Sequence, residues 1–286
     1  MPQGVRVQVP PRPQCYNPFM SEKGMEIKGS GPHYWRATDL QTYREDVNTL
    51  GQNPKYFARF NKPMADRAKR KFGTPIHLLD IACGPADELK FLENDPDIRL
   101  IATDISTDVL LRMTRQNLRQ NAVVFDMDVS KPPVMPDNSV ECGILMNAVI
   151  YSPDKMLKVM FDALRPGGEC TVNFTIPKRS LHWGIIENSL EDDGIKSLDR
   201  ELKVEGRSAP FAVKVLDFSE SLDSKGKPDE VARAAGQQLF FRSLKDVEEL
   251  IRLAGFEMME HSTFDSVSKD ITRRTDVFVL KKPETF

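Results

Sequence analysis

The sequence predicts an α/β protein with a doubly wound, mostly parallel sheet. Short apolar runs alternate with helix-length amphipathic stretches from Ile76 to Phe174, which is typical of parallel strands joined by helices. The chain has 286 residues, of which 40% are hydrophobic and 29% are charged, enough for one large domain with an elaboration. No apolar run approaches the length of a membrane span, and the N-terminal stretch has no secretory hydrophobic region. We therefore expect a cytoplasmic protein without a membrane partner.

The first predicted strand runs from Ile76 to Asp80 and leads into the small-residue turn Ala82-Cys83-Gly84. Glycine allows a backbone to approach a ligand closely or to adopt a positive φ, so this turn is a candidate cofactor loop. A second apolar run ends in Asp104, about twenty residues farther along the chain. A carboxylate at that place can accept hydrogen bonds from both hydroxyls of a ribose. Together these features predict a cofactor that contains adenosine.

The charge after the loop indicates which adenosine cofactor fits. Asp87 and Glu88 lie at the start of the next predicted helix. Carboxylates are favourable at a helix N-terminus, but they would repel the pyrophosphate that a nicotinamide dinucleotide places there. A sulfonium cofactor with an amino-acid tail carries no phosphate. S-adenosylmethionine therefore fits better than NAD.

The third and fourth predicted strands supply more candidate ligand contacts. Ala122 to Phe125 is a short buried strand, after which Asp128 and Val129 can meet an adenine ring. Taken alone, Asp128 is equally consistent with an aspartate in a turn. The fourth strand, Val140 to Leu145, places Asn147 and Tyr151 near the carboxyl edge of the sheet, where ligands bind in open α/β folds.

The remaining core elements are predicted from helix-capping residues and from the spacing of apolar residues. A helix is expected after Ser152 and Pro153, followed by a turn at 165–168 and a strand at 169–174. Ser243 begins another helix, which Gly255 ends. Two further strands, Phe256–Glu260 and Asp276–Leu280, complete the sheet.

The segments outside the core differ in composition. Residues 1–32, rich in Pro and Gly, are interpreted as a flexible arm, and residues 33–75 as a helical lid with many aromatic side chains. The same aromatic side chains are equally consistent with the buried face of helices that dock on the main domain. Residues 1–75 contain 13 Lys and Arg against 6 Asp and Glu, a net charge of +7. Such a segment could attract RNA, although a solvated helix face explains the same charges.

An insertion separates the core, residues 76–176, from its C-terminal part, residues 239–286. Residues 177–238 exceed what one crossover needs, and we expect a helix over Leu181–Leu202 and a hairpin that includes Phe211. Placed after the fifth strand, this insertion would cover the carboxyl edge of the sheet and select the substrate. His182 lies within it.

The core resembles the class I S-adenosylmethionine-dependent methyltransferases. Four motifs follow the family's order: L-L-D-I-A-C-G-P-A, A-T-D-I-S, D-M-D-V and L-R-P-G-G-E-C-T-V. The resemblance implies a Rossmann-like sheet of seven strands with an antiparallel last strand. It also implies that S-adenosylmethionine is held by Asp80, Ala82, Cys83, Gly84, Asp104, Ile105, Asp128, Val129 and Asn147. Ala82 and Ala86 replace glycines of the family pattern, and an alanine forced to a positive φ would cost on the order of 1 kcal/mol.

The leading functional interpretation is O- or N-methylation of a small molecule by in-line displacement. Tyr151 and His182 are the candidate catalytic residues, in case the acceptor must lose a proton. Two alternatives remain open: an RNA or protein acceptor, and a protein that binds the cofactor without catalysis. The spacing of the four histidines and four cysteines predicts neither a metal site nor a disulfide.

Overall fold

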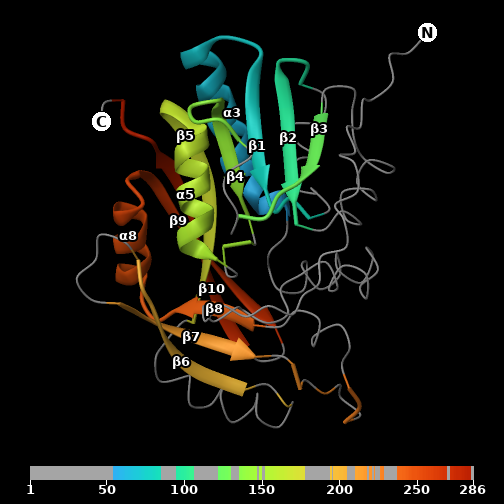
Figure 1. Ribbon diagram of the computed structural model, residues 1–286, viewed down its shortest axis with the longest axis vertical. Coiled ribbons are helices and arrows are strands. Elements are labelled where there is room, and N and C mark those ends of the chain that lie inside the picture. Colours follow the sequence, from blue (N-terminus) through green and yellow to red (C-terminus); the bar gives the residue numbers. More distant parts are fainter. Residues whose placement is uncertain are drawn as a thin grey trace, which may run out of the picture.

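The computed structural model describes residues 54–84, 95–105, 122–129, 135–146, 148–149, 152–177, 194, 196–204, 210–217, 219–220, 222, 226–228, 237–268 and 271–284. Figure 1 shows their arrangement. The helices are α3 (Pro54–Phe72), α5 (Pro153–Ala163) and α8 (Leu244–Leu253). The strands are β1 (Ile76–Ile81), β2 (Ile98–Asp104), β3 (Ala122–Asp126), β4 (Val140–Leu145), β5 (Leu164–Pro177), β6 (Lys196–Leu202), β7 (Phe211–Asp217), β8 (Gln237–Phe241), β9 (Glu257–Ser268) and β10 (Ile271–Lys281).

The main sheet has seven strands in the order β3-β2-β1-β4-β5-β10-β9 (Figure 1). Parallel pairing runs without a break from β3 to β5. β10 is antiparallel to both of its neighbours, β5 and β9. The expected doubly wound sheet with an antiparallel last strand is therefore confirmed.

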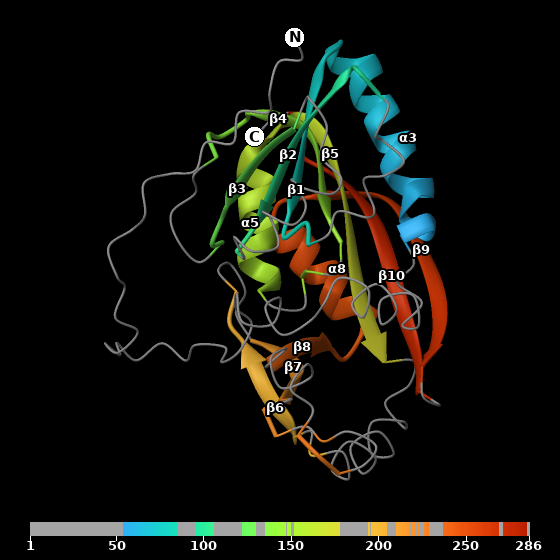
Figure 2. The ribbon, with the colours of Figure 1, turned by 90° about the vertical axis from the view of Figure 1, so that its right-hand side faces the viewer.

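Helices cover both faces of the main sheet (Figure 2). On one face, Phe60, Met64 and Ala65 of α3 pack with buried side chains such as Ile76 of β1 and Val277 of β10. On the other face, α5 and α8 pack against a second set of core residues. Burial on both faces explains why the parallel strands read as nearly continuous apolar runs. It also shows that Phe60, one of the aromatic residues assigned to a lid, is a core side chain.

Gly143 allows α5 to lie very close to β4. A Cβ atom at this position would be 2.2 Å from Met160 Sδ, far inside van der Waals contact. Met160 is itself fully buried. The glycine in the apolar run of β4 is therefore required by helix packing.

The inserted segment forms a second, three-stranded sheet in the order β6-β7-β8. We call it the small sheet. The expected helix over Leu181–Leu202 is wrong for residues 196–202, which form β6 and pair antiparallel with β7. The remainder of that expected helix lies outside the described residues. β8 also belongs to the small sheet, so the return to the main fold begins with α8.

Aromatic side chains fasten the small sheet to the main sheet. Phe241 of β8 lies edge-to-face against Phe174 of β5, with ring centroids 5.8 Å apart. Phe211 of β7 contacts Phe241 in the same way at 6.2 Å. All three rings are buried and belong to the core cluster on the α5 and α8 side. The small sheet therefore shares the main hydrophobic core.

Candidate functional site

The loop after β1 has the strained backbone that a tight ligand-binding turn requires. Ala82 has φ +56° and Gly84 has φ +49°, so two residues of this short turn are in the left-handed region. For alanine that conformation costs about 1–2 kcal/mol. The sequence analysis expected strain if Ala82 had a positive φ, and the structure shows that it does. Its methyl group packs against the core, which offsets part of the cost.

Asp104 ties this loop to the end of β2. The Gly84 backbone N–H donates to Asp104 Oδ2 at 3.0 Å, and the Cys83 N–H donates to the carbonyl of Thr103 at 2.9 Å. The Asp104 side chain is almost fully buried. The loop and the acid predicted to bind the ribose therefore form one unit at the carboxyl edge of the sheet.

Two further hydrogen bonds hold this unit in place. The Thr103 hydroxyl donates to the carbonyl of Asp80 at 3.1 Å, which joins the ends of β1 and β2. The Met127 N–H donates to the carbonyl of Asp104 at 2.9 Å, which brings the segment after β3 alongside. Asp80 is completely buried. The role of Thr103 was missed in the sequence, where a threonine near the end of a buried strand gives only a weak signal.

The exposed surface beside Asp104 suits an adenosine. Ile105, the next residue, is 41% exposed although it is a large apolar side chain. Asp128 and Val129 follow the end of β3 and are half-buried. A buried carboxylate beside an exposed apolar side chain offers hydrogen bonds to a ribose and a flat contact to a base. The residues present therefore fit the expected cofactor.

Three predicted site residues, Asn147, Tyr151 and His182, lie outside the described residues. The structure therefore brings together the first three strand ends of the predicted cofactor site and leaves the catalytic predictions untested. Among the described residues, no group of three or more His, Cys, Asp or Glu side chains is arranged to hold a metal ion.

The small sheet lies beside this edge of the main sheet. In Figures 1 and 2 it is below the carboxyl ends of β1, β2 and β4, on the side to which β5 points. The contact between Phe174 and Phe241 fixes it there. A ligand at the strand ends would thus face the small sheet.

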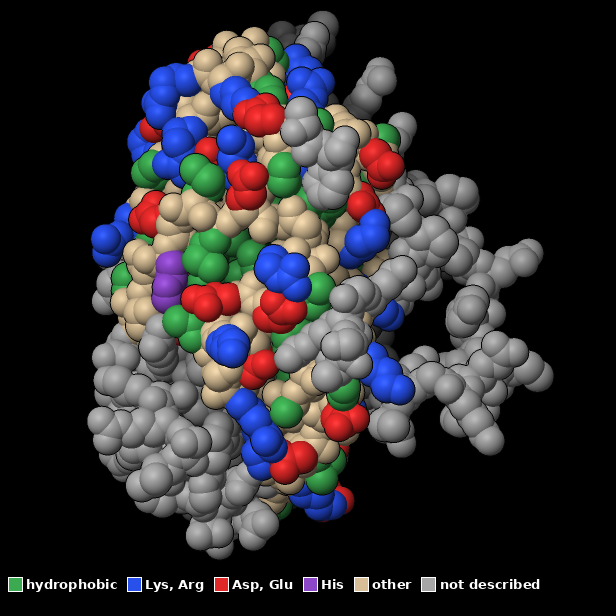
Figure 3. Space-filling model, turned by 90° about the vertical axis from the view of Figure 1, so that its left-hand side faces the viewer, with side chains coloured by type: hydrophobic (Ala, Val, Ile, Leu, Met, Phe, Trp, Pro, Cys, Tyr) green, Lys and Arg blue, Asp and Glu red, His purple; other side chains and the backbone are tan. Residues whose placement is uncertain are grey.

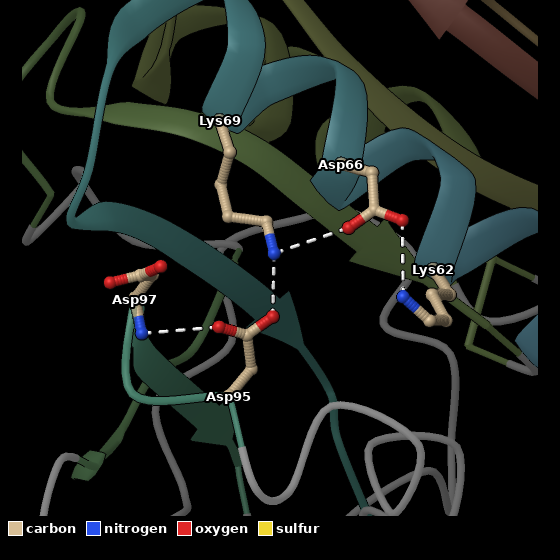
Figure 4. Close-up of polar contacts among 5 residues, drawn as sticks. All are labelled: Lys62, Asp66, Lys69, Asp95 and Asp97. Atoms are coloured by element: carbon tan, nitrogen blue, oxygen red, sulfur yellow. Dashed lines mark hydrogen bonds and ion pairs between the residues drawn. The ribbon is translucent and has the colours of Figure 1, made fainter.

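Basic side chains of α3 are engaged by carboxylates of the same chain. Lys69 bridges Asp66 at 3.1 Å and Asp95 at 2.6 Å, and Lys62 also binds Asp66 (Figure 4). Arg67 pairs with Glu169 at 2.8 Å, and Lys71 pairs with Glu284. On the face shown in Figure 3, basic and acidic side chains are interspersed. These pairs weaken the case for an RNA-binding surface on α3.

The same contacts shift the ionisation of these groups. Partial burial disfavours the charged form of Asp66, but hydrogen bonds from Lys62 and Lys69 outweigh it and lower the pKa of Asp66. Burial likewise opposes the charge of Asp95, yet the bond from Lys69 and the Asp97 backbone N–H lower the pKa of Asp95. The bond to Asp95 is the main reason that the pKa of Lys69 is raised.

The order of the strands and the loop after β1, which is hydrogen-bonded to Asp104, define a Rossmann-like methyltransferase fold. Residues 78–168 match a family model described as a methyltransferase domain. This match agrees with the resemblance to the class I S-adenosylmethionine-dependent methyltransferases and with S-adenosylmethionine as the cofactor. No curated protein matches the sequence.

Solved structures support the fold at low sequence identity. A methyltransferase from Methanosarcina mazei is 13% identical with a TM-score of 0.52, and the match covers 73% of this chain and 93% of that one. A methyltransferase from Clostridium acetobutylicum is 12% identical with a TM-score of 0.51, covering 85% and 98%. The [4+2]-cyclase SpnF is 13% identical with a TM-score of 0.50, covering 79% and 80%. Within the described residues, no helix is long and apolar enough to cross a membrane.

Proposed function

We propose that this protein transfers the methyl group of S-adenosylmethionine to an oxygen or nitrogen atom of a small-molecule acceptor. The observation that carries this proposal is the small sheet, which is packed into the core beside the carboxyl edge. A rigid cover at this position limits the size of an acceptor. An extended RNA or protein acceptor would need an open edge instead, and the described basic side chains of α3 are mostly ion-paired.

When bound, S-adenosylmethionine supplies a methyl group already activated by the sulfonium. The protein's task is then to position the two reactants and to exclude water. Asp104 would accept hydrogen bonds from the ribose, and the backbone of the loop at Ala82, Cys83 and Gly84 would hold the amino-acid tail. Ile105, Asp128 and Val129 would contact the base. Asp80 and Asn147 complete the predicted contacts.

The proposed roles are a flexible arm at 1–32 and a cover at 177–238, flanked by core parts at 76–176 and 239–286. Of the lid predicted at 33–75, only residues 33–53 keep that role, because α3 packs in the core. We also propose a cytoplasmic location. These assignments rest on composition and on the position of the small sheet. Limited proteolysis with and without cofactor would test the lid, because binding should protect sites within 33–53.

Tyr151 is the proposed acceptor-facing residue, with His182 as the second candidate. Tyr151→Phe keeps the ring and removes the hydroxyl. If the hydroxyl orients or deprotonates the acceptor, turnover should fall by roughly tenfold to a thousandfold, while cofactor binding changes little. A variant with full turnover would remove the hydroxyl from the mechanism, and His182→Ala would then be the next test.

The function itself is tested by isothermal calorimetry with S-adenosylmethionine, followed by transfer of labelled methyl groups into fractionated cell extract. We expect saturable cofactor binding and label in a low-molecular-weight product. Label only in RNA or protein would favour the alternative acceptors. Tight binding without transfer to any fraction would favour a non-catalytic role.

A further inference from the structure

A bulge in the edge strand β9 brings two side chains onto one face. The register of β9 against β10 shifts at Met259, which is an extra residue between the paired ones. Without it, Met258 and His261, three positions apart, would lie on opposite faces of the strand. With it, they are opposite Leu280 and Phe278, two alternate residues of β10. Met258 and His261 are therefore neighbours on the face of the sheet where α5 and α8 pack.

The imidazole of His261 is held by a buried carboxylate. Its Nε2 lies 2.6 Å from Asp276 Oδ1, and the Thr263 hydroxyl donates to the same oxygen at 2.9 Å. Asp276 is fully buried. The imidazole also stacks on Phe278, with ring centroids 4.5 Å apart and planes 6° from parallel. These contacts fix the orientation of the ring.

The other ring nitrogen of His261, Nδ1, is free to bind a ligand. A carboxylate only accepts hydrogen bonds, so Nε2 carries the proton and Nδ1 keeps its lone pair. None of the described residues makes a hydrogen bond to Nδ1. Along this face, Asp276 lies on one side of His261 and Met258 on the other. The two ring nitrogens point in diverging directions, so Nδ1 lies on the side of the ring away from Asp276.

Met258 places a thioether beside this nitrogen where solvent can reach both. The Met258 side chain is 40% exposed, and the imidazole of His261 is 24% exposed. Thioether sulfur is soft and polarizable, and soft ligands select Cu(I). A histidine that ligates a metal almost always donates its other N–H to a carboxylate, a carbonyl or water, and Asp276 is in that position. The face thus combines an oriented imidazole with a soft ligand.

We propose that Met258 Sδ and His261 Nδ1 bind a soft monovalent ion, Cu(I) or its analogue Ag(I), with Asp276 as the positioning residue behind the imidazole. The site is separate from the cofactor loop, because β4, β5 and β10 lie between β1 and β9 in the main sheet (Figure 2). It also differs in kind from the clusters of His, Cys, Asp and Glu that hold harder cations, of which the described residues contain none.

Thiols are the main competitors for such an ion within the chain. Cys83, Cys142 and Cys170 are buried, and burial raises the pKa of both Cys142 and Cys170, which disfavours their thiolates. Cys15 lies outside the described residues. The full-length protein with Cys15→Ser is therefore the parent for every measurement.

The test measures ion binding directly. Cu(I) is titrated without oxygen against the colorimetric chelator bicinchoninate, and Ag(I) is followed by NMR of protein labelled at the methionine methyl groups. We expect a single equivalent of either ion to bind and to shift the Met258 methyl signal, which is assigned by its absence in Met258→Leu. Met258→Leu and His261→Gln each remove a ligand and should abolish this binding. Asp276→Asn should weaken it by about tenfold to a hundredfold.

Met259→Leu and His77→Gln are the matched controls. Met259 is an adjacent thioether with 55% exposure. His77 Nδ1 lies 3.2 Å from the buried carboxylate of Glu141, a similar pair at the amino edge of the sheet. Both variants should bind Cu(I) as the parent does. Ag(I) should raise the melting temperature of the parent and of both controls, but not that of Met258→Leu.

Unchanged Cu(I) affinity in Met258→Leu would overturn the proposal, and so would loss of binding in Met259→Leu. Zn(II) that bound as tightly as Cu(I) and shifted the same methyl signal would also overturn it, because a thioether is a poor ligand for a harder ion. Met258→Leu is a conservative change at an exposed position, so the test stays decisive even if His261→Gln is unstable. None of these measurements depends on methyl transfer.

Discussion

The amino edge and the carboxyl edge of the main sheet use charge in opposite ways. At the amino edge, charged side chains bind one another or backbone groups: Lys69 joins Asp66 to Asp95, and Glu141 accepts from both the Arg165 guanidinium and the His77 backbone N–H. At the carboxyl edge, buried Asp104 holds the N–H of a strained loop. The first arrangement joins elements of the fold, and the second shapes the surface at which we propose that the cofactor binds.

The difference shows why the charge of a segment is a poor guide to its partners. Residues 1–75 carry a net charge of +7, yet Lys69 of α3 is satisfied by Asp66 and Asp95, the second of which lies outside that segment. The position of a single acid at the opposite edge, Asp104, is more informative about the ligand than the net charge of residues 1–75 is.

The largest expected effect is on the carboxyl edge. Asp104→Ala should weaken S-adenosylmethionine binding by about a hundredfold or more, because at least two hydrogen bonds to a charged group, each of about 1.5–3 kcal/mol, are lost. Isothermal calorimetry would measure the change. Asp97→Ala, just before the amino end of β2, is the matched control and should bind as the wild type does.

Asp104→Asn separates two roles of this side chain. The amide oxygen can still accept from the Gly84 N–H, so the loop should keep its shape while the charge is lost. We expect affinity between those of the wild type and Asp104→Ala. Wild-type affinity in a folded Asp104→Ala protein would contradict the assignment.

A smaller effect is expected at the amino edge from Lys282→Met. Lys282 Nζ donates to Asn138 Oδ1 and to the carbonyls of Phe161 and Leu164, each at 2.8 Å, and its pKa is lowered by burial. Removing this shared donor should lower the free energy of unfolding by about 1–3 kcal/mol in urea, without changing cofactor affinity. Lys281→Met is the control, because that ammonium contacts only Glu284 among the pairs described, at 3.4 Å. An equal decrease in the free energy of unfolding in both variants would show that the hydrogen bonds of Lys282 do not stabilise the fold specifically.

Ala82→Gly should act on the binding edge in the favourable direction. Glycine removes the strain at φ +56°, a gain of up to about 1 kcal/mol after the lost methyl packing and the added chain entropy are subtracted. Unfolding in urea and cofactor calorimetry would both report it. Ala102→Gly, in buried strand β2, is the control and should destabilise. If Ala82→Gly lowered the free energy of unfolding as much as Ala102→Gly does, the packing of the methyl group would outweigh the backbone strain.

The smallest effect concerns the ion pairs in Figure 4. Asp66 and Asp95 have lowered pKa values, so their stabilising contribution is complete above the ordinary aspartate pKa near 3.9 and is lost as the pH falls through the lower folded-state values. Lys69→Met should therefore destabilise at pH 7 by roughly 0.2–1 kcal/mol, and by much less near pH 2. Urea unfolding at both pH values, at low and high salt, measures this. A deficit independent of pH would indicate packing of the lysine stem instead.

Strands buried on both faces were predicted well from the sequence. The expected and observed limits of β1 and β4 agree within about one residue, and β2 ends at Asp104 as expected, because these strands are mostly apolar and end at polar or small residues. The order of parallel strands predicted that Gly84 and Asp104 lie at neighbouring strand ends, but not the hydrogen bond between them. The strain at Ala82 could be stated only as a condition, since φ depends on the path of the whole loop.

The small sheet and the ion pairs were not predictable in the same way. Residues 196–202 contain good helix formers such as Lys, Leu, Arg and Glu, but pairing with β7 selects a strand. The bond from Lys69 to Asp95 joins positions that no local pattern connects. Both features depend on contacts between distant segments.

The position of β10 between β5 and β9 determines the order in which the molecule can assemble. β9 precedes β10 in the chain, yet it joins the sheet only through β10, whose pairing of Arg273 with Pro177 closes a long loop. Such distant pairing forms slowly. Phe174, on which the small sheet docks, also packs against Phe278 of β10 at 5.9 Å. We therefore expect the small sheet to dock late in folding, and until β10 pairs with it, β5 has an unpaired strand edge that is prone to aggregation.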